Sequence, residues 1–288
     1  MPPVSESRLH HLNCGTMCPW GQRYINGEGG LLASARLVCH VLLIEGADGL
    51  VLVDTGFGSD DVRNPRQISV PFTAMMRPRL EVGETAVSQV RARGFDPADV
   101  RHIVLTHLDV DHAGGLPDFP QAKVHVWARE HDAMMRPPLR ERVRYVIGKA
   151  HWAHGPDWAT HEFAGDEWLG FESVRVLPDS DSEILLIPLP GHSLGHTGVA
   201  LRQPNGWLLH CGDAFFYRDE VSTPTRCPPA LRAFQTMVRL ALPVRGRVCR
   251  ACGVPARRWR GRRCRIDVRG RTGTALPRRA SRSAPDER

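Results

Sequence analysis

Four side chains able to bind a metal ion stand within six residues of one another, directly after an apolar run that predicts a strand. The segment THLDVDHAGG spans residues 106–115, and its candidate ligands are His107, Asp109, Asp111 and His112. Neutral imidazoles and carboxylates are ligands that zinc binds in proteins, and a position left to water makes such a site catalytic. A solvated polar turn is the alternative interpretation. The pattern predicts a metal-binding loop at a strand end.

Two later segments each add one candidate ligand after a further apolar run. PLPGHSLGHTG, residues 188–198, supplies His192, and LLHCGDA, residues 208–214, supplies Asp213. A glycine precedes each side chain and suits a sharp turn at the end of a strand. Considered singly, His192 is more typical of a structural histidine and Asp213 of a turn or a helix cap. Together with the first cluster, they predict ligands that converge from successive strand ends.

The apolar patterning predicts many strands with helices between them. Two apolar runs around an Ala-Asp-Gly turn predict a hairpin over 36–54, and a helix over 84–93 and a strand over 101–105 follow. Further elements are predicted as strands at 123–127, 172–177, 184–189, 197–202 and 206–211 and as a helix at 128–136. No clear pattern marks 145–168. Such alternation favours an α/β or α+β sandwich over a helical bundle.

Composition excludes several other classes of protein. With 42% hydrophobic and 24% charged residues over 288 positions, the chain is typical of a globular protein. No stretch approaches the ~18 consecutive apolar residues of a membrane span, and the N-terminus lacks the apolar core of a secretory signal. We therefore expect a cytoplasmic protein that does not enter a membrane. The eight cysteines are too scattered for a disulfide framework, so we expect reduced thiols.

Residues 239–288 differ in character from the rest of the chain. They hold 16 arginines and three acidic residues, which leaves residues 1–238 with a small net negative charge. Arg, Gly, Pro and Ala crowd together without a helical or alternating period, so we predict a disordered tail. Because GC-rich codons encode these residues, we hypothesise an out-of-frame translation. Three cysteines in the tail lack the fourth ligand that a structural zinc site needs; they are Cys249, Cys252 and Cys264.

The motifs resemble, in order and spacing, those of the metallo-β-lactamase superfamily. The match includes Asp54 in VLVDTG and covers residues 10–238. We expect residues 1–238 to form a metallo-β-lactamase-like hydrolase domain. The opening HHLNCGTMCP, residues 10–19, also looks like the N-terminal strand of the acyl-homoserine-lactone lactonase branch. The resemblance implies an α+β fold, an αββα sandwich, with a dinuclear metal site at the sheet edges between its two halves.

The resemblance also implies a role for each motif residue. A first ion would be held by His107, Asp109 and His192. A second ion would be held by Asp111 and His112, and Asp213 would bridge the two ions. Asp54 would accept the outer N–H of a ligating imidazole, which fixes the tautomer of that ring. His196 would either play a similar supporting part or be a hydrogen-bonded loop histidine.

The sequence departs from the family pattern at two places. The family usually has a histidine where this chain has Asp109, and a carboxylate there makes manganese or iron(II) plausible beside zinc for the one or two ions. Asp109 could instead point away as a turn carboxylate. The family also adds a terminal histidine ligand after a late strand, whereas no histidine follows His210 here. We therefore predict an incomplete second metal site and the loss of the last strand and helix of the fold.

These observations predict a hydrolase, because a bound divalent ion lowers the pKa of water toward ~7 and polarises a carbonyl or phosphoryl oxygen. Asp111 is the candidate catalytic residue, since it could orient this water and accept its proton. Tyr217 could donate to the developing oxyanion, although its apolar neighbours favour a core position. We expect a small lactone or carboxylic ester as substrate and no nucleic-acid partner. A phosphodiesterase or nuclease and a metal-poor pseudoenzyme are the alternatives.

Overall fold

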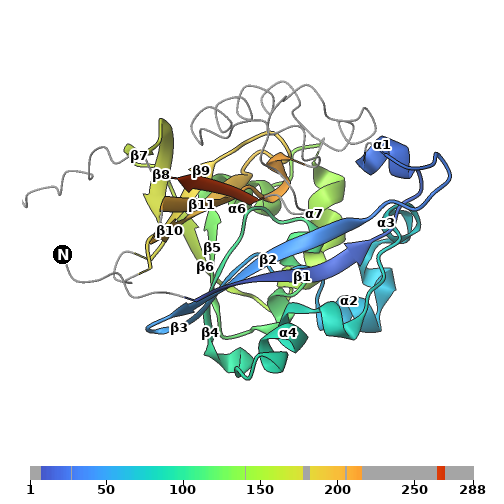
Figure 1. Cartoon of the computed structure of the whole chain (residues 1–288), viewed down its shortest axis with the longest axis horizontal. Helices are drawn as coiled ribbons and strands as arrows, with labels where there is room; N and C mark the ends of the chain where they lie inside the picture. The colour runs from blue at the N-terminus through green and yellow to red at the C-terminus, as the bar shows by residue number, and fades with distance from the viewer. Residues whose placement is uncertain are drawn as a thin grey trace, which may run out of the picture.

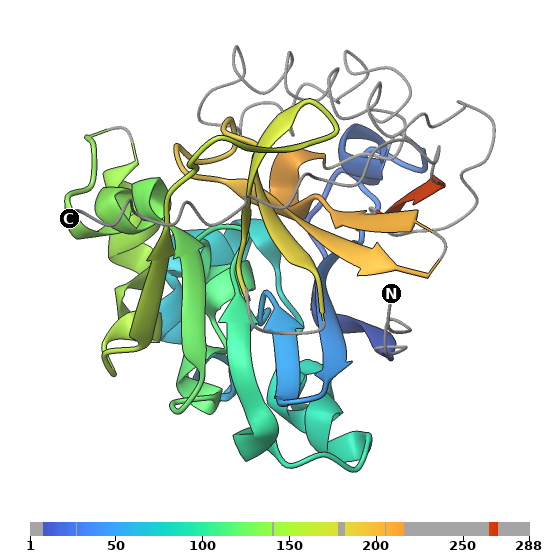
Figure 2. The ribbon, with the colours of Figure 1, turned by 90° about the vertical axis from the view of Figure 1, so that its left-hand side faces the viewer.

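The computed structural model describes residues 8–26, 28–139, 141–177, 182–204, 206–215 and 265–269. In these residues, two six-stranded sheets pack face to face, and helices cover the outer face of the first sheet (Figures 1 and 2). This arrangement confirms the predicted α+β sandwich. None of the helices in the described ranges is both long and apolar enough to span a membrane.

The first sheet mixes antiparallel and parallel pairing. Its strands, in spatial order, are β1 (Leu9–Met17), β2 (Leu37–Gly46), β3 (Gly49–Val53), β4 (Val100–Val104), β5 (Lys123–Trp127) and β6 (Asp157–His161). The first three strands pair antiparallel, and β3 to β6 run parallel. The predicted hairpin over 36–54 is confirmed as β2 and β3, which close at the pair Gly46 and Gly49. Strand β6 lies in the segment for which the sequence predicted no clear structure.

The second sheet is antiparallel throughout. Its strands, in spatial order, are β12 (Arg265–Arg269), β11 (Gly206–His210), β10 (Thr197–Gln203), β9 (Ile184–Pro188), β8 (Phe171–Arg175) and β7 (Asp166–Trp168). The strands predicted at 172–177, 184–189, 197–202 and 206–211 are confirmed within two residues at each end.

Short helices connect the strands. The α-helices are α1 (Gln22–Asn26), α2 (Ser59–Arg63), α3 (Val70–Met76), α4 (Ala86–Ala92), α5 (Val110–Ala113), α6 (Ala128–Met135) and α7 (Arg142–Gly148). The 3-10 turns are η1 (Pro65–Ile68), η2 (Val82–Glu84), η3 (Pro97–Asp99), η4 (Leu116–Asp118), η5 (Lys149–Trp152) and η6 (Gly212–Ala214). The predicted helices at 84–93 and 128–136 are confirmed as α4 and α6. Thr85 caps α4 by accepting a hydrogen bond from the Ser88 N–H.

The side chains of strand β2 alternate between the two apolar clusters on opposite faces of the first sheet. Val41 and Leu43 belong to the apolar cluster beneath the helices, whereas Leu42 and Ile44 belong to the cluster between the two sheets. Successive side chains of a strand point to opposite faces, so a strand covered on both sides reads as a continuous apolar run. This strand therefore lies in the middle of the molecule, and its neighbour β3 delivers Asp54 to the sheet edge.

The Arg-rich segment contributes one described strand, β12, which pairs with β11 along the edge of the second sheet. The prediction that this segment has no alternating period is wrong at Arg265–Arg269, which reads Arg-Ile-Asp-Val-Arg, a period of two. The rest of 239–288 lies outside the described residues, and so do the three tail cysteines. The predicted loss of a last helix therefore stays a prediction.

Candidate metal centre

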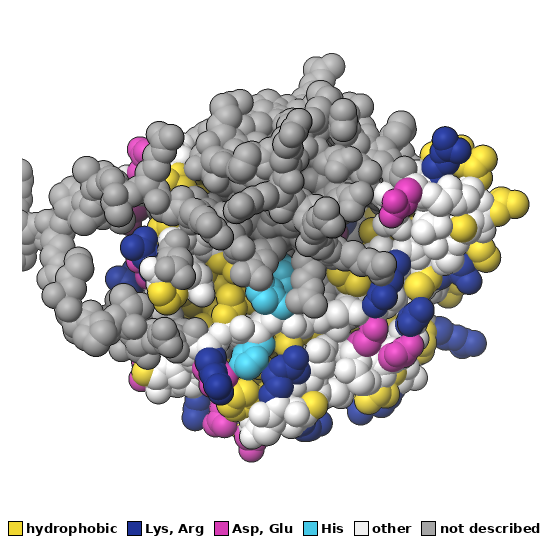
Figure 3. Space-filling model, in the orientation of Figure 1, with side chains coloured by type: hydrophobic (Ala, Val, Ile, Leu, Met, Phe, Trp, Pro, Cys, Tyr) yellow, Lys and Arg dark blue, Asp and Glu magenta, His cyan; other side chains and the backbone are white. Residues whose placement is uncertain are grey.

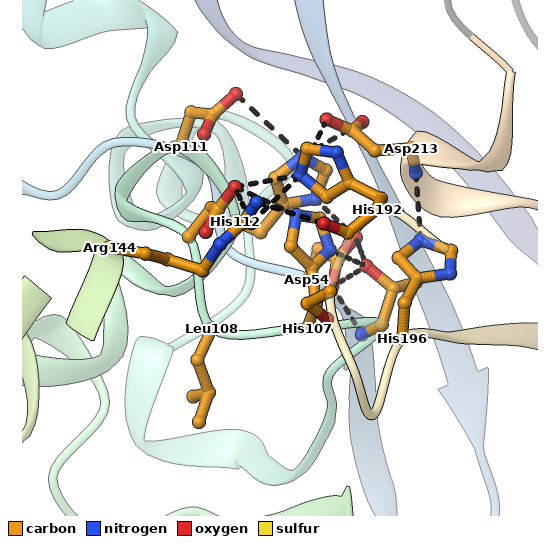
Figure 4. Close-up of polar contacts among 12 residues, drawn as sticks. Asp54, His107, Leu108, Asp111, His112, Arg144, His192, His196 and Asp213 are labelled. Atoms are coloured by element: carbon orange, nitrogen blue, oxygen red, sulfur yellow. Dashed lines mark hydrogen bonds and ion pairs between the residues drawn. The ribbon is translucent and has the colours of Figure 1, made fainter. Parts of the chain in front are cut away.

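The predicted ligands meet at the edge where the two sheets face each other. The loop after β4 and helix α5 supplies the cluster of 106–115, the loop between β9 and β10 supplies His192, and the turn after β11 supplies Asp213 (Figure 4). Two groups of side chains have ligand atoms within 4.8 Å of one another: His107 with His112 and Asp213, and His107 with Asp109 and His192. Asp111 lies beside the first group, with Oδ2 3.7 Å from His112 Nε2. All six predicted ligands are therefore brought together.

Asp213 lies between the two groups. Its Oδ1 is 3.2 Å from His112 Nε2, and its Oδ2 is 3.6 Å from His192 Nε2. One carboxylate oxygen thus faces each group, which is the arrangement that a bridging ligand needs. That Asp213 bridges two ions stays a prediction.

Asp109 points into the centre, not away from it. Its Oδ2 lies 2.8 Å from His192 Nε2 and 3.5 Å from His107 Nε2. The interpretation of Asp109 as a turn carboxylate that points outward is therefore wrong, although metal binding by this group stays a prediction.

The donor set fits a divalent ion. His107 Nε2 is buried and has no hydrogen-bond partner among the described residues. Burial, with an added effect of His112, lowers the pKa of His107 to about 4, so its imidazole is neutral at pH 7 and keeps a lone pair. A buried, unpartnered nitrogen is costly unless another group uses it. Imidazole nitrogens and carboxylate oxygens suit zinc, manganese or iron(II).

Asp54 supports the centre from beneath. It follows β3 with a backbone φ of 60°, a left-handed conformation that Asp tolerates better than most residues, and it is fully buried. Its Oδ1 accepts the Thr106 N–H at 2.8 Å, and its Oδ2 lies 2.9 Å from His112 Nδ1. The predicted contact between Asp54 and the outer nitrogen of a candidate ligand is therefore present. Burial alone would raise the pKa of Asp54, but His112 and His210 hold it below its usual range.

His196 is a loop histidine that orients the turn carrying Asp213. Its Nδ1 donates to the Leu189 carbonyl at 3.0 Å, and its Nε2 accepts the Asp213 N–H at 3.0 Å. The turn needs glycine at residue 212, where φ is 49° and a Cβ would lie 2.7 Å from His196 Nε2. His196 is therefore both a hydrogen-bonded loop histidine and a supporting residue, because its hydrogen bonds hold the turn of the candidate ligand Asp213 in place.

Glu130 on α6 is a buried carboxylate that belongs to no motif visible in the sequence. Its Oε1 accepts the Leu108 N–H at 3.1 Å, and its Oε2 accepts the Ser193 hydroxyl at 2.7 Å and the Gly195 N–H at 3.0 Å. It joins the loop of His107 to the loop of His192. Burial raises the pKa of Glu130.

Arg144 on α7 is the second residue that sequence reasoning missed. It donates to Asp109 Oδ2 and to the His192 backbone carbonyl inside the centre. Helix α7 begins just before the segment where no apolar period is visible, so no sequence signal linked it to the ligands. Tyr217, the candidate oxyanion donor, lies outside the described residues.

Asp111 has the electrostatics of a group that exchanges protons near neutral pH. Burial, together with the nearby carboxylates of Asp213 and Asp109, raises its pKa to about 6, against the opposing effect of His112. A base is most effective when its pKa lies near the working pH. That Asp111 is the catalytic residue stays a prediction.

Comparison with known proteins identifies the family. The family model described as "Metallo-beta-lactamase superfamily" matches residues 35–245, which is most of the chain. This chain belongs to the metallo-β-lactamase superfamily. The "Probable metallo-hydrolase Rv2300c" of Mycobacterium tuberculosis is 44% identical over 238 residues, covering 82% of this chain and 71% of that protein. The "N-acyl homoserine lactonase AttM" of Agrobacterium fabrum is 28% identical over 203 residues, covering 70% and 73%.

Solved structures of the superfamily share the fold. One is an N-acyl homoserine lactone hydrolase with the product N-hexanoyl-L-homoserine bound at its catalytic metal center, with a TM-score of 0.65, 21% identity, and coverage of 86% of this chain and 89% of that one. Another is AidC, described as a dizinc quorum-quenching lactonase, with a TM-score of 0.56, 18% identity, and coverage of 84% and 81%. These likenesses support the metallo-β-lactamase fold.

Proposed function

We propose that this metallo-hydrolase cleaves a lactone or carboxylic ester, with Asp111 as its catalytic base. The observation that carries the proposal is the meeting of imidazoles and carboxylates in two groups with ligand atoms within 4.8 Å. Residues from three separate loops converge there, which a structural role alone does not require. The named lactonases among the relatives and structural neighbours support this substrate class.

Each side chain of the centre has a part in the proposed reaction. His107, His112 and Asp213 would hold one divalent ion, with Asp109 and His192 available on the other side of His107. When bound, a divalent ion of this kind supplies an activated water and polarises the substrate carbonyl.

Asp111 orients the attacking water and takes its proton, because its carboxylate has a pKa of about 6 and borders His112 Nε2. Asp54 accepts the outer N–H of His112, so this imidazole presents Nε2 to the centre. The proton then resides on Asp111 until the leaving alkoxide takes it.

Turnover by the full chain tests the proposal. Protein supplied with zinc is expected to open acyl-homoserine lactones or cleave aryl esters, and a chelator should abolish this turnover. Asp111→Asn is expected to lower kcat by about 10²–10⁴-fold, the usual range for a general base. The exposed His154→Gln serves as the matched control and should retain activity. Absence of chelator-sensitive turnover on both substrate classes would reject the assignment.

The charged side chains visible on one face of the molecule give a nuclease function no support. On the face that Figure 3 shows, Lys and Arg side chains lie interspersed with Asp and Glu instead of forming one continuous basic patch. Nucleic-acid binding depends on a concentration of positive charge along one face. Salt-sensitive binding that survives deletion of residues 239–288 would favour the nuclease alternative.

A further inference from the structure

Arg144 reaches from α7 into the metal centre and contacts two predicted ligands at once (Figure 4). Its Nη1 donates to Asp109 Oδ2 and lies 3.0 Å from His192 Nε2, and its Nη2 donates to the His192 carbonyl at 2.9 Å. Only 14% of the Arg144 side chain is exposed. The guanidinium is therefore a fixed part of the centre.

The two contacted atoms are the ones that a metal ion would use. Asp109, His192 and His107 form one of the two candidate metal groups. Arginine has donors only, so the Arg144 contact uses the lone pair of His192 Nε2, whereas the 2.8 Å contact with Asp109 Oδ2 requires a proton on the same nitrogen. A metal ion needs that lone pair free, so in either tautomer these contacts compete with a metal ion for His192.

Charge adds to this competition. Asp109 Oδ2 accepts a hydrogen bond from the Arg144 guanidinium, and the two side chains form an ion pair inside the centre. An arginine does not lose its proton in a protein, so a metal ion could displace it only by moving the side chain. The other candidate group contains neither Asp109 nor His192.

We propose that the Arg144 guanidinium takes the cation position of the group His107, Asp109 and His192, so that the centre binds one divalent ion tightly. That ion lies in the group His107, His112 and Asp213. The inference rests on the proposed metal-dependent function and concerns how many ions serve it. The proposal also explains why this chain has an aspartate at residue 109, where the family usually has a histidine. A neutral histidine there would offer no negative charge to pair with the guanidinium, whereas Asp109 does.

Zinc stoichiometry of the full chain tests the proposal. Metal-free protein is titrated with Zn²⁺ by isothermal calorimetry, and bound zinc is measured after desalting. The wild type is expected to bind one zinc tightly. Arg144→Gln is expected to bind a second zinc at least about tenfold more tightly than the wild type does, because the charged hydrogen bond that competes for Asp109 is lost. Arg142→Gln, an exposed arginine on the same helix, should behave as the wild type.

The outcomes separate this inference from the proposed function. Two tightly bound zinc ions in the wild type would overturn the role of Arg144 and leave the hydrolase proposal intact. A single tight zinc in both the wild type and Arg144→Gln would also overturn it, because the guanidinium would then not be what limits the number of bound ions. No bound zinc in any variant would overturn both proposals.

A pair of ligand variants tests the position of the ion without relying on Arg144→Gln. His192→Ala is expected to keep one tightly bound zinc, because His192 is already engaged by the guanidinium. His112→Ala is expected to lose it. Circular dichroism verifies that both variants fold. Retention of zinc by His112→Ala with loss in His192→Ala would contradict the proposal.

Discussion

His210 Nε2 lies 3.2 Å from Asp54 Oδ2, the same oxygen that His112 Nδ1 approaches at 2.9 Å. Both rings donate to this carboxylate oxygen, and both are buried. His210 belongs to β11, so the second sheet reaches across to fix a carboxylate of the first. His210 is a positioning residue for Asp54, which in turn positions His112.

His210→Phe is therefore expected to weaken zinc binding by about 10–100-fold, the usual effect of losing a group that orients a metal ligand. Phenylalanine keeps the ring volume but removes the donor to Asp54. Competition with a fluorescent zinc chelator measures the affinity. The control is His102→Phe, which should bind zinc as the wild type does. His102 lies on β4 and contacts His125 instead of Asp54. Equal affinity of both variants would show that Asp54 needs no help from His210.

Glu130 should matter for stability because three buried donors depend on it. Glu130→Ala leaves the Leu108 and Gly195 amides and the Ser193 hydroxyl without this acceptor, and each unsatisfied buried group costs about 1–3 kcal/mol. We expect the free energy of unfolding to fall by roughly 2–4 kcal/mol, given partial relaxation. Urea unfolding of the metal-free protein measures this. Asp132→Ala, exposed on the same helix, should cost far less, and equal losses for both would argue against the bridging role.

Acid should destabilise the protein through a row of histidines on the first sheet. His125 lies between His102 and His161, with nitrogen–nitrogen distances of 2.9 Å on both sides. Burial, then the charges of His161, His102 and Lys123, lowers the pKa of His125 to about 3 from an ordinary 6.5. The folded state thus binds fewer protons than the unfolded state between these values, so stability is lost as pH falls through this window.

His125→Phe is expected to flatten this pH dependence, by up to about 1.4 kcal/mol per pH unit for one proton. Unfolding midpoints measured between pH 4 and pH 7 provide the comparison, with His131→Phe on α6 as the matched control. A pH profile of His125→Phe that parallels the wild type would refute the assignment.

The sequence identified the side chains that meet at the centre because most of them lie in short motifs. His107 lies in the loop after β4 and His112 in the short helix α5 that follows it, and the glycines after them are visible as a motif. Gly114, for example, needs its small size because a Cβ would lie 2.5 Å from the Val110 carbonyl. The hairpin of β2 and β3 was predictable for a similar reason, since its apolar runs and turn are contiguous.

Glu130 and Arg144 could not be predicted, because each acts through tertiary packing alone. Nothing in the pattern of α6 distinguishes Glu130 from an exposed helical glutamate until the loops of His107 and His192 fold over it. Arg144 lies on a short helix next to a segment with no visible period. Strand β12 was missed because the surrounding arginines obscured its alternation.

Anomalous diffraction from crystals of the full chain grown with zinc tests the central claim most directly. Data collected on both sides of the zinc absorption edge locate the ion without any assumption about the site. The account predicts a peak within coordination distance, about 2.0–2.2 Å, of His107 Nε2, His112 Nε2 and an oxygen of Asp213. Zinc found only elsewhere on the molecule, or no peak at saturating zinc, would contradict it.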